Sequence, residues 1–379
     1  MNRADVAVVG GGIVGLAMAW ESARRGQSVV LFERSRLAHG ASIRNFGMVW
    51  PIGQPPGERY QLALRSQQRW LELGQKAGIS VQRCGSVHLA HADDEAAVLQ
   101  EFAAQAPGLG IDCRWVEAKE LLARQPALTR ENLRGGLHSD AELVVDPREV
   151  IARLPHYLAE AYGVTLRYET AIVGVDLPTI RSASGDTWHV DRCFVCTGAD
   201  FESLFPDVYA RAGVRRCKLQ MMRTAPQLDG WRLGTHLAGG LTLAHYQAFE
   251  VCPTLPRLKA RLQAEYGDYL DLGIHVMASQ NARGEVVIGD SHEYDDYTIF
   301  DRRDIDERIL RYLQTMIRLP DERIAERWHG VYAKHPSLPW VEAEPQPGCQ
   351  VIVSPGGAGM TLSFGIAAQW WDRHTGTTP

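Results

Sequence analysis

The first forty residues alternate between short apolar runs and a glycine-rich turn. Residues 6–9 form a strand-like apolar run, residues 13–20 form an apolar stretch of helical length, and residues 28–32 form a second strand-like run. Gly10, Gly11 and Gly12 separate the first run from the helical stretch. This order predicts a strand, a glycine turn, a helix and a second strand at the start of the chain.

The rest of the chain continues this mixture of patterns. Helices are predicted at 57–74, 93–105, 148–162 and 305–319. Strands are predicted at 81–90 (two strands around a turn), 164–168, 170–175, 192–199, 217–224, 241–252, 274–279, 285–290 and 351–353, and residues 115–122 run from a strand into a short helix.

Three glycines of the first turn have separate physical roles. Gly10 permits the tight turn from strand to helix, Gly12 lets a ligand approach a backbone without a Cβ, and Gly15 lets the helix pack close to the strand. The start of the helix presents unpaired N–H groups and a positive dipole end to a phosphate. Glu33 ends the second strand, where a carboxylate accepts hydrogen bonds from both ribose hydroxyls and repels a 2′-phosphate. These features predict a dinucleotide site that disfavours NADP.

The composition is that of an ordinary globular protein. The 379 residues are enough for two domains, and 45% of them are hydrophobic and 22% charged. A formal net charge of −5 provides no basic field for nucleic acid or anionic lipid. The longest uncharged apolar stretch, residues 6–20, is too short to cross a bilayer, and no small-residue cleavage site follows it. We expect a mature N-terminus and a cytoplasmic protein that neither binds nucleic acid nor spans a membrane.

The cysteines do not form a metal-binding pattern. There are seven, and Cys193 and Cys196 lie in one apolar run, where the period of two puts them on opposite faces of a strand. No second pair stands at zinc spacing. We expect reduced, buried thiols and no metal site.

The segment after Glu33 contains small, polar and basic residues where a surface helix would be expected. It includes the stretch Gly40-Ala41-Ser42-Ile43-Arg44-Asn45-Phe46-Gly47. This stretch resembles the Gly-Ala-Ser-x-Arg-Asn-x-Gly segment of the D-amino-acid oxidase-like superfamily of FAD amine oxidases, which includes glycine oxidase, sarcosine oxidase and the D-amino-acid dehydrogenases. The resemblance implies that these residues lie along the pyrophosphate, ribityl chain and isoalloxazine ring of FAD. The residue types agree, because Ser42 and Arg44 can donate to phosphate oxygens.

Two later segments extend the resemblance over essentially the whole chain. Ile172 falls where the family has an apolar residue whose backbone bonds the adenine, and residues 192–199 are similar to the family's strand that ends in Thr-Gly-Ala. Residues 351–363 contain a strand, a glycine turn and a helix start, and they resemble the family's C-terminal flavin motif. A helix start at the N1–C2=O edge favours the negative charge of a reduced flavin.

The resemblance implies FAD as the cofactor and a discontinuous α/β Rossmann-like FAD-binding domain made of residues 1–80, 145–217 and 326–379. It implies a second, α+β substrate-binding domain with an antiparallel sheet, made of residues 81–144 and 218–325. The residues expected to bind FAD are Gly10, Gly12, Ile13, Val14, Gly15, Glu33, Arg34, Ala41, Ser42, Arg44, Asn45, Phe46, Gly47, Met48, Ile172, Thr197, Gly198, Gly357, Ala358, Gly359, Met360 and Thr361.

One motif departs from the family pattern. Amino-acid-oxidising members commonly carry Gly-Leu-Arg-Pro after a tryptophan near the C-terminal motif, and its arginine often holds the substrate carboxylate. Here the matching stretch is Trp328-His329-Gly330-Val331-Tyr332-Ala333-Lys334-His335-Pro336, in which Tyr332 takes the place of the arginine. Lys334 and His335 follow, and they could hold a different anion, such as a phosphonate, as point charges rather than as a fork.

We therefore expect oxidation of the C–N bond of a small amine that bears an acidic group, giving an imine that hydrolyses to an aldehyde or keto acid. Residues 273–277 and 289–294 are similar to a branch of the superfamily associated with aminophosphonate breakdown. The expected substrate is 2-aminoethylphosphonate or its N-methyl derivative, and the expected product is phosphonoacetaldehyde. The catalytic candidates are His245, Tyr246, His275, Tyr332, Lys334 and His335.

Several alternatives remain open on the sequence. The substrate could be glycine, sarcosine or a D-amino acid. Electrons could pass to molecular oxygen, which we favour, or to a quinone or carrier protein. A flavoprotein with a binding or RNA-modifying role is an alternative of another class, which the lack of a basic patch disfavours. The sequence leaves open whether FAD is covalent and what the oligomeric state is.

Overall fold

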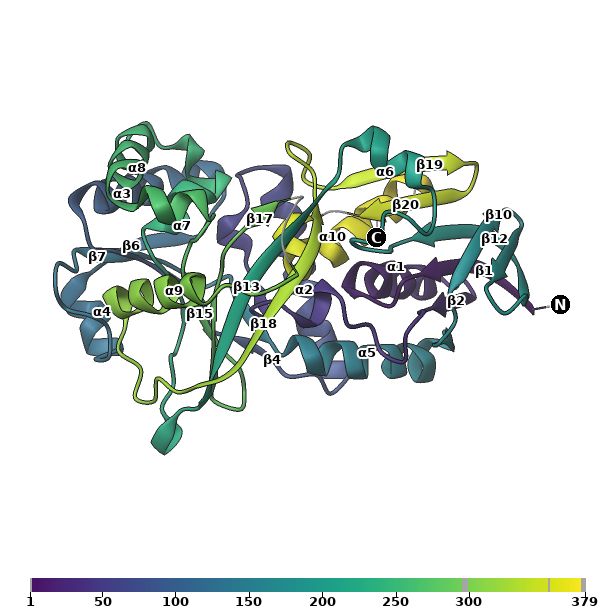
Figure 1. The fold of residues 1–379 in the computed structure, drawn as a ribbon, viewed down its shortest axis with the longest axis horizontal. Coiled ribbons are helices and arrows are strands. Elements are labelled where there is room, and N and C mark those ends of the chain that lie inside the picture. The colour runs from purple at the N-terminus through teal and green to yellow at the C-terminus, as the bar shows by residue number, and fades with distance from the viewer. Residues whose placement is uncertain (1, 295–298, 354, 376–379) are drawn as a thin grey trace.

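An eight-stranded sheet forms one part of the molecule in the computed structural model, which describes residues 2–294, 299–353 and 355–375 (Figure 1). The path of this sheet is β10-β11-β12-β1-β2-β9, with β20 beside β12 and β19 beside β20. Its strands are β1 (Asn2–Val9), β2 (Val29–Phe32), β9 (Thr165–Arg167), β10 (Ile172–Asp176), β11 (Thr179–Ser182), β12 (Thr187–Val195), β19 (Val341–Gln346) and β20 (Cys349–Val353). The pairs of β1 with β12 and β2, of β2 with β9 and of β12 with β20 are parallel.

Both faces of this sheet are covered, and therefore its central strands are apolar at consecutive positions. In β1, Val6 and Val8 belong to one buried cluster, and Ala7 and Val9 belong to another. The first cluster includes side chains of α1 (Ile13–Arg24), α2 (Glu58–Lys76), α5 (Pro147–Tyr162) and α10 (Gly359–Thr375). The second includes residues of α6 (Pro206–Ala212).

Two cysteines follow the same alternation. Cys193 packs in the second of these clusters and Cys196 in the first, and both are free thiols. The prediction that they lie reduced and buried on opposite faces is confirmed.

A nine-stranded sheet, mostly antiparallel, forms the other large part. Its path is β17-β13-β16-β15-β14-β5-β7-β6, with β18 beside β13. The strands are β5 (Ser86–Ala90), β6 (Cys113–Glu117), β7 (Gly135–Ser139), β13 (Arg215–Pro226), β14 (His236–Ala238), β15 (Met277–Gln280), β16 (Glu285–Gly289), β17 (Glu293–Tyr294) and β18 (Ile324–Lys334). Its helices are α3 (Asp93–Gln105), α4 (Ala118–Arg124), α7 (Leu241–His245), α8 (Leu255–Asp271) and α9 (Arg303–Met316). A small antiparallel sheet joins β3 (Met48–Val49), β8 (Leu143–Val145) and β4 (Val81–Arg83).

The two longest strands connect the two large parts. β13 and β18 pair antiparallel from Arg215 with Lys334 to Thr224 with Ile324, and they cross the middle of the molecule side by side (Figure 1). The domain limits expected near residues 217 and 326 therefore fall inside continuous strands. The assignment of residues to two domains stays a prediction.

The predicted strand at 241–252 is wrong. The segment forms α7 and the short 3-10 helix η5 (Gln247–Val251), because Leu241, Ala244 and Ala248 recur at helical spacing and local backbone hydrogen bonds close the turns. The helical turn matters for the site, since it ends at His245.

Other differences are small. The regular strand within 274–279 begins at Met277, and α9 ends at Met316 because Ile317 is extended, with φ −153°. In the part of the chain that the structure describes, no helix combines the length and the apolar character needed to cross a bilayer.

Candidate active site

One cavity of about 1060 Å³ is walled by both large sheets. Segments from the start, the middle and the end of the chain line it together. Of the residues expected to bind the cofactor, those on the wall are Gly10, Gly12, Ile13, Val14, Glu33, Arg34, Ala41, Ser42, Arg44, Asn45, Phe46, Met48, Ile172, Thr197, Gly198, Gly357, Ala358, Gly359, Met360 and Thr361. Gly15 and Gly47 lie behind the wall and shape its backbone.

The glycine turn after β1 is packed too closely for side chains. Gly10 has φ +110°, and a Cβ there would lie 2.4 Å from the carbonyl oxygen of Cys196. A Cβ at Gly15 would lie 1.9 Å from the carbonyl oxygen of Gly10. The start of α1 is therefore held against the end of β1, with its N–H groups at the cavity.

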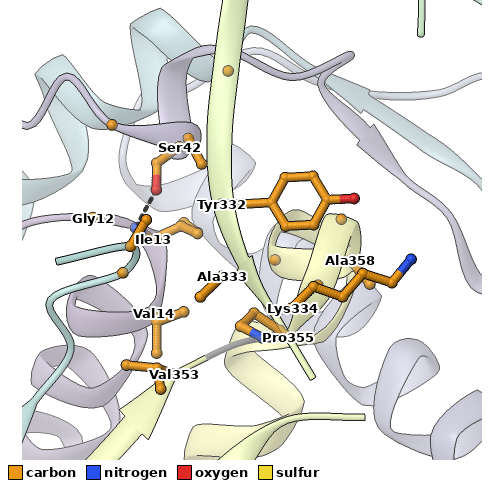
Figure 2. A pocket seen from close by; sticks show the side chains of 18 of the residues that line it. Gly12, Ile13, Val14, Ser42, Tyr332, Ala333, Lys334, Val353, Pro355 and Ala358 are labelled. Atoms are coloured by element: carbon orange, nitrogen blue, oxygen red, sulfur yellow. Dashed lines mark hydrogen bonds between the residues drawn. The ribbon is translucent and has the colours of Figure 1, made fainter. Parts of the chain in front are cut away.

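Ser42 caps the first helix. Its Oγ accepts a hydrogen bond from the backbone N–H of Ile13 at 2.9 Å, shown as the dashed line in Figure 2. The hydroxyl retains its own proton and can still donate to a phosphate oxygen. Ser42 thus fastens the segment after β2 to the start of α1.

Glu33 is fixed by two backbone N–H groups at the end of β2. Its Oε2 accepts from Gly11 at 2.9 Å and its Oε1 accepts from Ser35 at 3.0 Å. The carboxylate is buried but lies on the cavity wall. Each oxygen has a further lone pair, so the group can also accept a ribose hydroxyl.

The segment that carries the Arg-Asn-x-Gly motif is folded by its own side chains. The Asn45 amide donates to the carbonyls of Ala41 and Ser42, and its oxygen accepts from the N–H of Gly47 at 2.8 Å. Gly47 has φ +72°, and a Cβ there would lie 2.0 Å from the carbonyl oxygen of Val145. Arg44 donates to the carbonyl of His329 at 3.1 Å, so its guanidinium joins this segment to β18.

The C-terminal motif joins the same wall. A 3-10 turn, η6 (Gly356–Ala358), leads into α10. The hydroxyl of Thr361 accepts from the N–H of Trp50 at 2.9 Å, and the carbonyl of Met360 accepts from the indole N–H of Trp70 at 2.8 Å. The start of α10 is thereby held beside the segment that follows β3.

These features fit FAD. The cavity has a backbone approach without side chains at Gly10 and Gly12, two helix starts, an acid at the end of β2 and a volume large enough for a dinucleotide. The roles of the individual residues stay predictions. Arg34 is mostly exposed and pairs with Asp200, and Thr197 exchanges a hydrogen bond with the hydroxyl of Tyr209.

Three histidine rings stack on the wall formed by the nine-stranded sheet. We call His245, His275 and His292 the histidine stack. The ring centroids of His245 and His275 are 3.7 Å apart with planes 7° from parallel, and His292 lies 4.9 Å and 5.0 Å from the other two. His245 and His275 were predicted, and His292 and its neighbour Asp290 were not.

A sequence signal for the missed residues existed. The segments around His275 and Asp290 pair through two backbone hydrogen bonds of 3.2 Å, which places His292 beside His275. The predicted strands 274–279 and 285–290 follow one another in the chain, and pairing them as a hairpin indicates that His292 lies near His275.

Burial dominates the electrostatics of the stack. It lowers the pKa of His245 and His275 well below the ordinary value and that of His292 to about 4, and the charge of Lys334 adds to this effect in all three. Burial raises the pKa of Asp290 well above the usual carboxyl range. The stack is therefore neutral at pH 7 in this structure.

The stack has the composition of a metal site but not its geometry. One nitrogen of each ring lies within 4.8 Å of the others. A metal ion binds an imidazole nitrogen at about 2.0–2.1 Å and close to the ring plane. The overlapping rings of His245 and His275 have nearly parallel planes, so one ion cannot lie near both planes.

Tyr332 and Lys334 leave β18 on the same side, and Ala333 between them points to the opposite side (Figure 2). The Tyr332 ring is buried, and burial raises the pKa of its hydroxyl well above the ordinary value. Lys334 Nζ lies 2.9 Å from the hydroxyl of Tyr294. His335 also lines the cavity, but its Nδ1 accepts the N–H groups of Ser337 and Leu338.

The six catalytic candidates therefore share one wall but not one role. His245 and His275 form the stack, with the edge of Tyr246 against them at 5.2 Å and 5.7 Å. Lys334 contributes a charge, and His335 stabilises a turn instead of pairing with Lys334.

Comparison with known proteins identifies the class. The profile of the family described as "DAO: FAD dependent oxidoreductase" matches residues 5–370, and the chain belongs to this family. Glycine oxidase of Geobacillus kaustophilus (strain HTA426) is 27% identical over 209 residues, which are 52% of this chain and 55% of that protein. L-2-hydroxyglutarate dehydrogenase of Escherichia coli (strain K12) is 21% identical over 237 residues, which are 59% of this chain and 54% of that protein. The chain spans about half the length of the curated relatives it matches.

Solved structures share the fold over the full length. The crystal structure of glycine oxidase from Geobacillus kaustophilus has a TM-score of 0.77 at 20% identity and covers 100% of this chain and 96% of its own. That of L-proline dehydrogenase from P. horikoshii has a TM-score of 0.78 at 18% identity and covers 100% and 95%. The predicted fold class, the family and FAD as the cofactor are confirmed.

Proposed function

We propose that this protein uses FAD to oxidise the C–N bond of a small amine that bears an acidic group, and that the substrate is 2-aminoethylphosphonate or its N-methyl derivative. The flavin, when bound, accepts a hydride from the carbon beside the amine. The resulting imine hydrolyses to phosphonoacetaldehyde. The protein binds the acidic group, orients the amine and excludes water.

The observation that carries the proposal is the exchange of an arginine for a tyrosine and a lysine on β18. Tyr332 is buried, uncharged and unable to form a bidentate ion pair with a carboxylate. Lys334 lies two residues further along β18 on the same face. Its Nζ donates to the hydroxyl of Tyr294, which carries no charge. A lysine acts as a point charge, which suits a tetrahedral phosphonate as well as a planar carboxylate.

The other cations that line the cavity have partners of several kinds. Arg34 pairs with Asp200 and Arg216 pairs with Glu202, while Arg44 donates to the carbonyl of His329 and Arg59 donates to the side-chain oxygen of Gln247. Lys334 sits against the neutral Tyr294 ring on the same face of β18 as Tyr332, so its charge can attract an anion bound there.

The test is reduction of the bound flavin by candidate amines without oxygen, followed through the visible absorbance. We expect 2-aminoethylphosphonate or N-methyl-2-aminoethylphosphonate to bleach the flavin, and glycine, sarcosine and D-amino acids to do so much more slowly. Faster bleaching by the amino acids would overturn the aminophosphonate assignment. A flavin that stays oxidised with every amine would favour the binding or RNA-modifying alternative.

The electron acceptor is tested on the reduced protein. We propose an oxidase, for which oxygen restores the flavin spectrum on the timescale of turnover. Slow reoxidation by oxygen and fast reoxidation by a quinone would make the protein a dehydrogenase. The chain is similar both to a protein named as an oxidase and to proteins named as dehydrogenases.

A further inference from the structure

We propose that the histidine stack takes the ammonium proton of the substrate, and that the acidic group of the same substrate, bound at Lys334, makes the stack basic enough to do so. The inference rests on the proposed function, since it needs a substrate that carries both an amine and an acid. It assigns an acceptor for the proton of the substrate ammonium, which the hydride transfer to the flavin does not remove.

An acceptor is needed because a free alkylamine is protonated at pH 7, with a pKa near that of lysine, about 10.4. An ammonium has no lone pair to stabilise the positive charge left at carbon when hydride departs. One N–H bond of the substrate must therefore break first, and the proton must form a new N–H bond elsewhere.

Hydrogen bonding fixes which nitrogen of His292 is basic. Nδ1 of His292 lies 3.0 Å from the carbonyl oxygen of Gly273, and Nδ1 of His275 lies 3.5 Å from the same oxygen. A carbonyl only accepts, so Nδ1 of His292 carries its hydrogen and Nε2 keeps its lone pair. The rings line the cavity, and an ammonium in the cavity can donate to that lone pair.

Stacking limits the stack to one proton. The rings of His245 and His275 lie face to face, so that when one of them is protonated, the neutral partner can stabilise its charge by stacking. Two protonated rings at 3.7 Å would repel each other strongly in a buried site. The capacity of the stack matches the one proton that the amine must lose.

The charged and titratable groups around the stack fix the condition for proton transfer. They are Asp290 beside His275, Tyr246 after α7, Tyr294 on β17, Cys217 on β13, and Tyr332 and Lys334 on β18. Burial raises the pKa of all three tyrosines and of Cys217, so these groups keep their protons at pH 7, and it raises the pKa of Asp290 well above the usual carboxyl range.

The charge of Lys334 opposes protonation of all three rings, and Arg215 lies over the Tyr294 ring at 5.0 Å. An anion bound at Lys334 cancels that opposition and adds an attraction of its own. A zwitterionic substrate would then bring both the proton and the charge that holds it, and binding would exchange no net proton with solvent.

The decisive probe is ethanesulfonate, an anion that has no amine and does not titrate near pH 7. Binding to the oxidised holoenzyme is followed through the flavin spectrum, and proton uptake is obtained by calorimetry in buffers of different ionisation enthalpy. At pH 7.5 we expect measurable proton uptake on binding, in an amount that grows as the pH is lowered. Binding without uptake, or no binding, would overturn the inference.

The matched variants are the double variant His275→Gln/His292→Gln and the control His39→Gln, which removes a histidine of the same cavity outside the stack. We expect the double variant to keep its flavin and bind ethanesulfonate with less than half of the uptake, and the control to keep full uptake. Equal proton uptake by the unaltered protein, the double variant and the control would show that the proton binds outside the histidine stack.

A pH profile gives a second readout. For the unaltered protein, we expect the rate of flavin reduction by 2-aminoethylphosphonate at low substrate concentration to change little between pH 6.5 and 8.5. In the double variant only the free amine reacts, so the rate should rise about tenfold per pH unit. Parallel profiles would contradict the inference. Proton uptake needs no turnover, so a flavin that no acidic amine reduces would refute the proposed function separately.

Discussion

The two halves of the cavity present different kinds of atoms. Around α1 the wall consists mainly of backbone, because Gly10 and Gly15 leave no room for side chains and Glu33 is held by two backbone N–H groups. On the opposite wall the surface consists of buried titratable side chains, of which His275 and Asp290 have strongly displaced pKa values. A cofactor with constant charge can be held by a fixed backbone. A substrate that changes its protonation state during the reaction requires side chains that can change theirs.

The largest effect is expected from Gly15→Ala. It should disrupt the half of the cavity around α1 and leave the half that carries the histidine stack unchanged. The added Cβ would lie 1.9 Å from the carbonyl oxygen of Gly10, so α1 must move away from β1. Overpacking of this kind costs about 1–3 kcal/mol of unfolding free energy. We expect nearly complete loss of bound flavin, measured as visible absorbance per protein, and a lower Tm. Gly108→Ala, where a Cβ meets nothing within 4 Å, should change neither quantity.

A smaller effect, confined to the second half, is expected from Lys334→Gln. Loss of the charge should raise the KM for 2-aminoethylphosphonate about tenfold or more, since a hydrogen bond to a charged group contributes about 1.5–3 kcal/mol. Flavin content should not change. Lys334→Arg keeps the charge and should recover part of the affinity in the same steady-state assay. An unchanged KM in Lys334→Gln would show that the acid binds elsewhere.

The effect that is smallest at neutral pH concerns the stability of the region behind the second half of the cavity. His88 is fully buried between Trp50 and Phe249, both of its ring nitrogens lack a partner among the described residues, and burial lowers its pKa to about 3. A folded-state pKa below the unfolded value of about 6.5 means that stability is full above pH 6.5 and falls as pH falls toward 3. The slope for one such group is at most about 1.4 kcal/mol per pH unit.

His88→Phe should therefore flatten the dependence of Tm on pH between 6.5 and 4, with little change at pH 7. Replacement of the exposed His156 on α5 by Gln should leave the dependence as it is. Identical pH profiles for His88→Phe and the unaltered protein would show that this ring is not a source of acid sensitivity.

The difference between the two halves of the cavity also explains which features the sequence could predict. The glycine turn, Glu33 and the C-terminal motif depend on local spacing between neighbouring residues, and local spacing is visible in a sequence. Helix and strand types were correct for most segments because α5 and β12, for example, bury whole faces with a regular period. The error at 241–252 arose where a five-residue helix carries too few turns to display its period.

The histidine stack could be predicted only in part. Its members come from α7, from the segment before β15 and from the segment before β17, and their meeting depends on how three chain segments pair. His245 and His275 were predicted as histidines within the strands expected at 241–252 and 274–279. The face-to-face contact, the inclusion of His292 and the separate role of His335 require coordinates.

The junction of the first and last helices has a consequence for biosynthesis. A Cβ at Gly359 would lie 3.6 Å from Ile13, so the start of α10 touches the start of α1 although the two are at opposite ends of the chain. A ribosome releases Ile13 long before Gly359. The nascent chain therefore cannot assemble this part of the flavin cradle until α10 has been made, and we expect a product truncated before α10 to be colourless. Yellow colour of the purified protein thus reports that translation has passed α10.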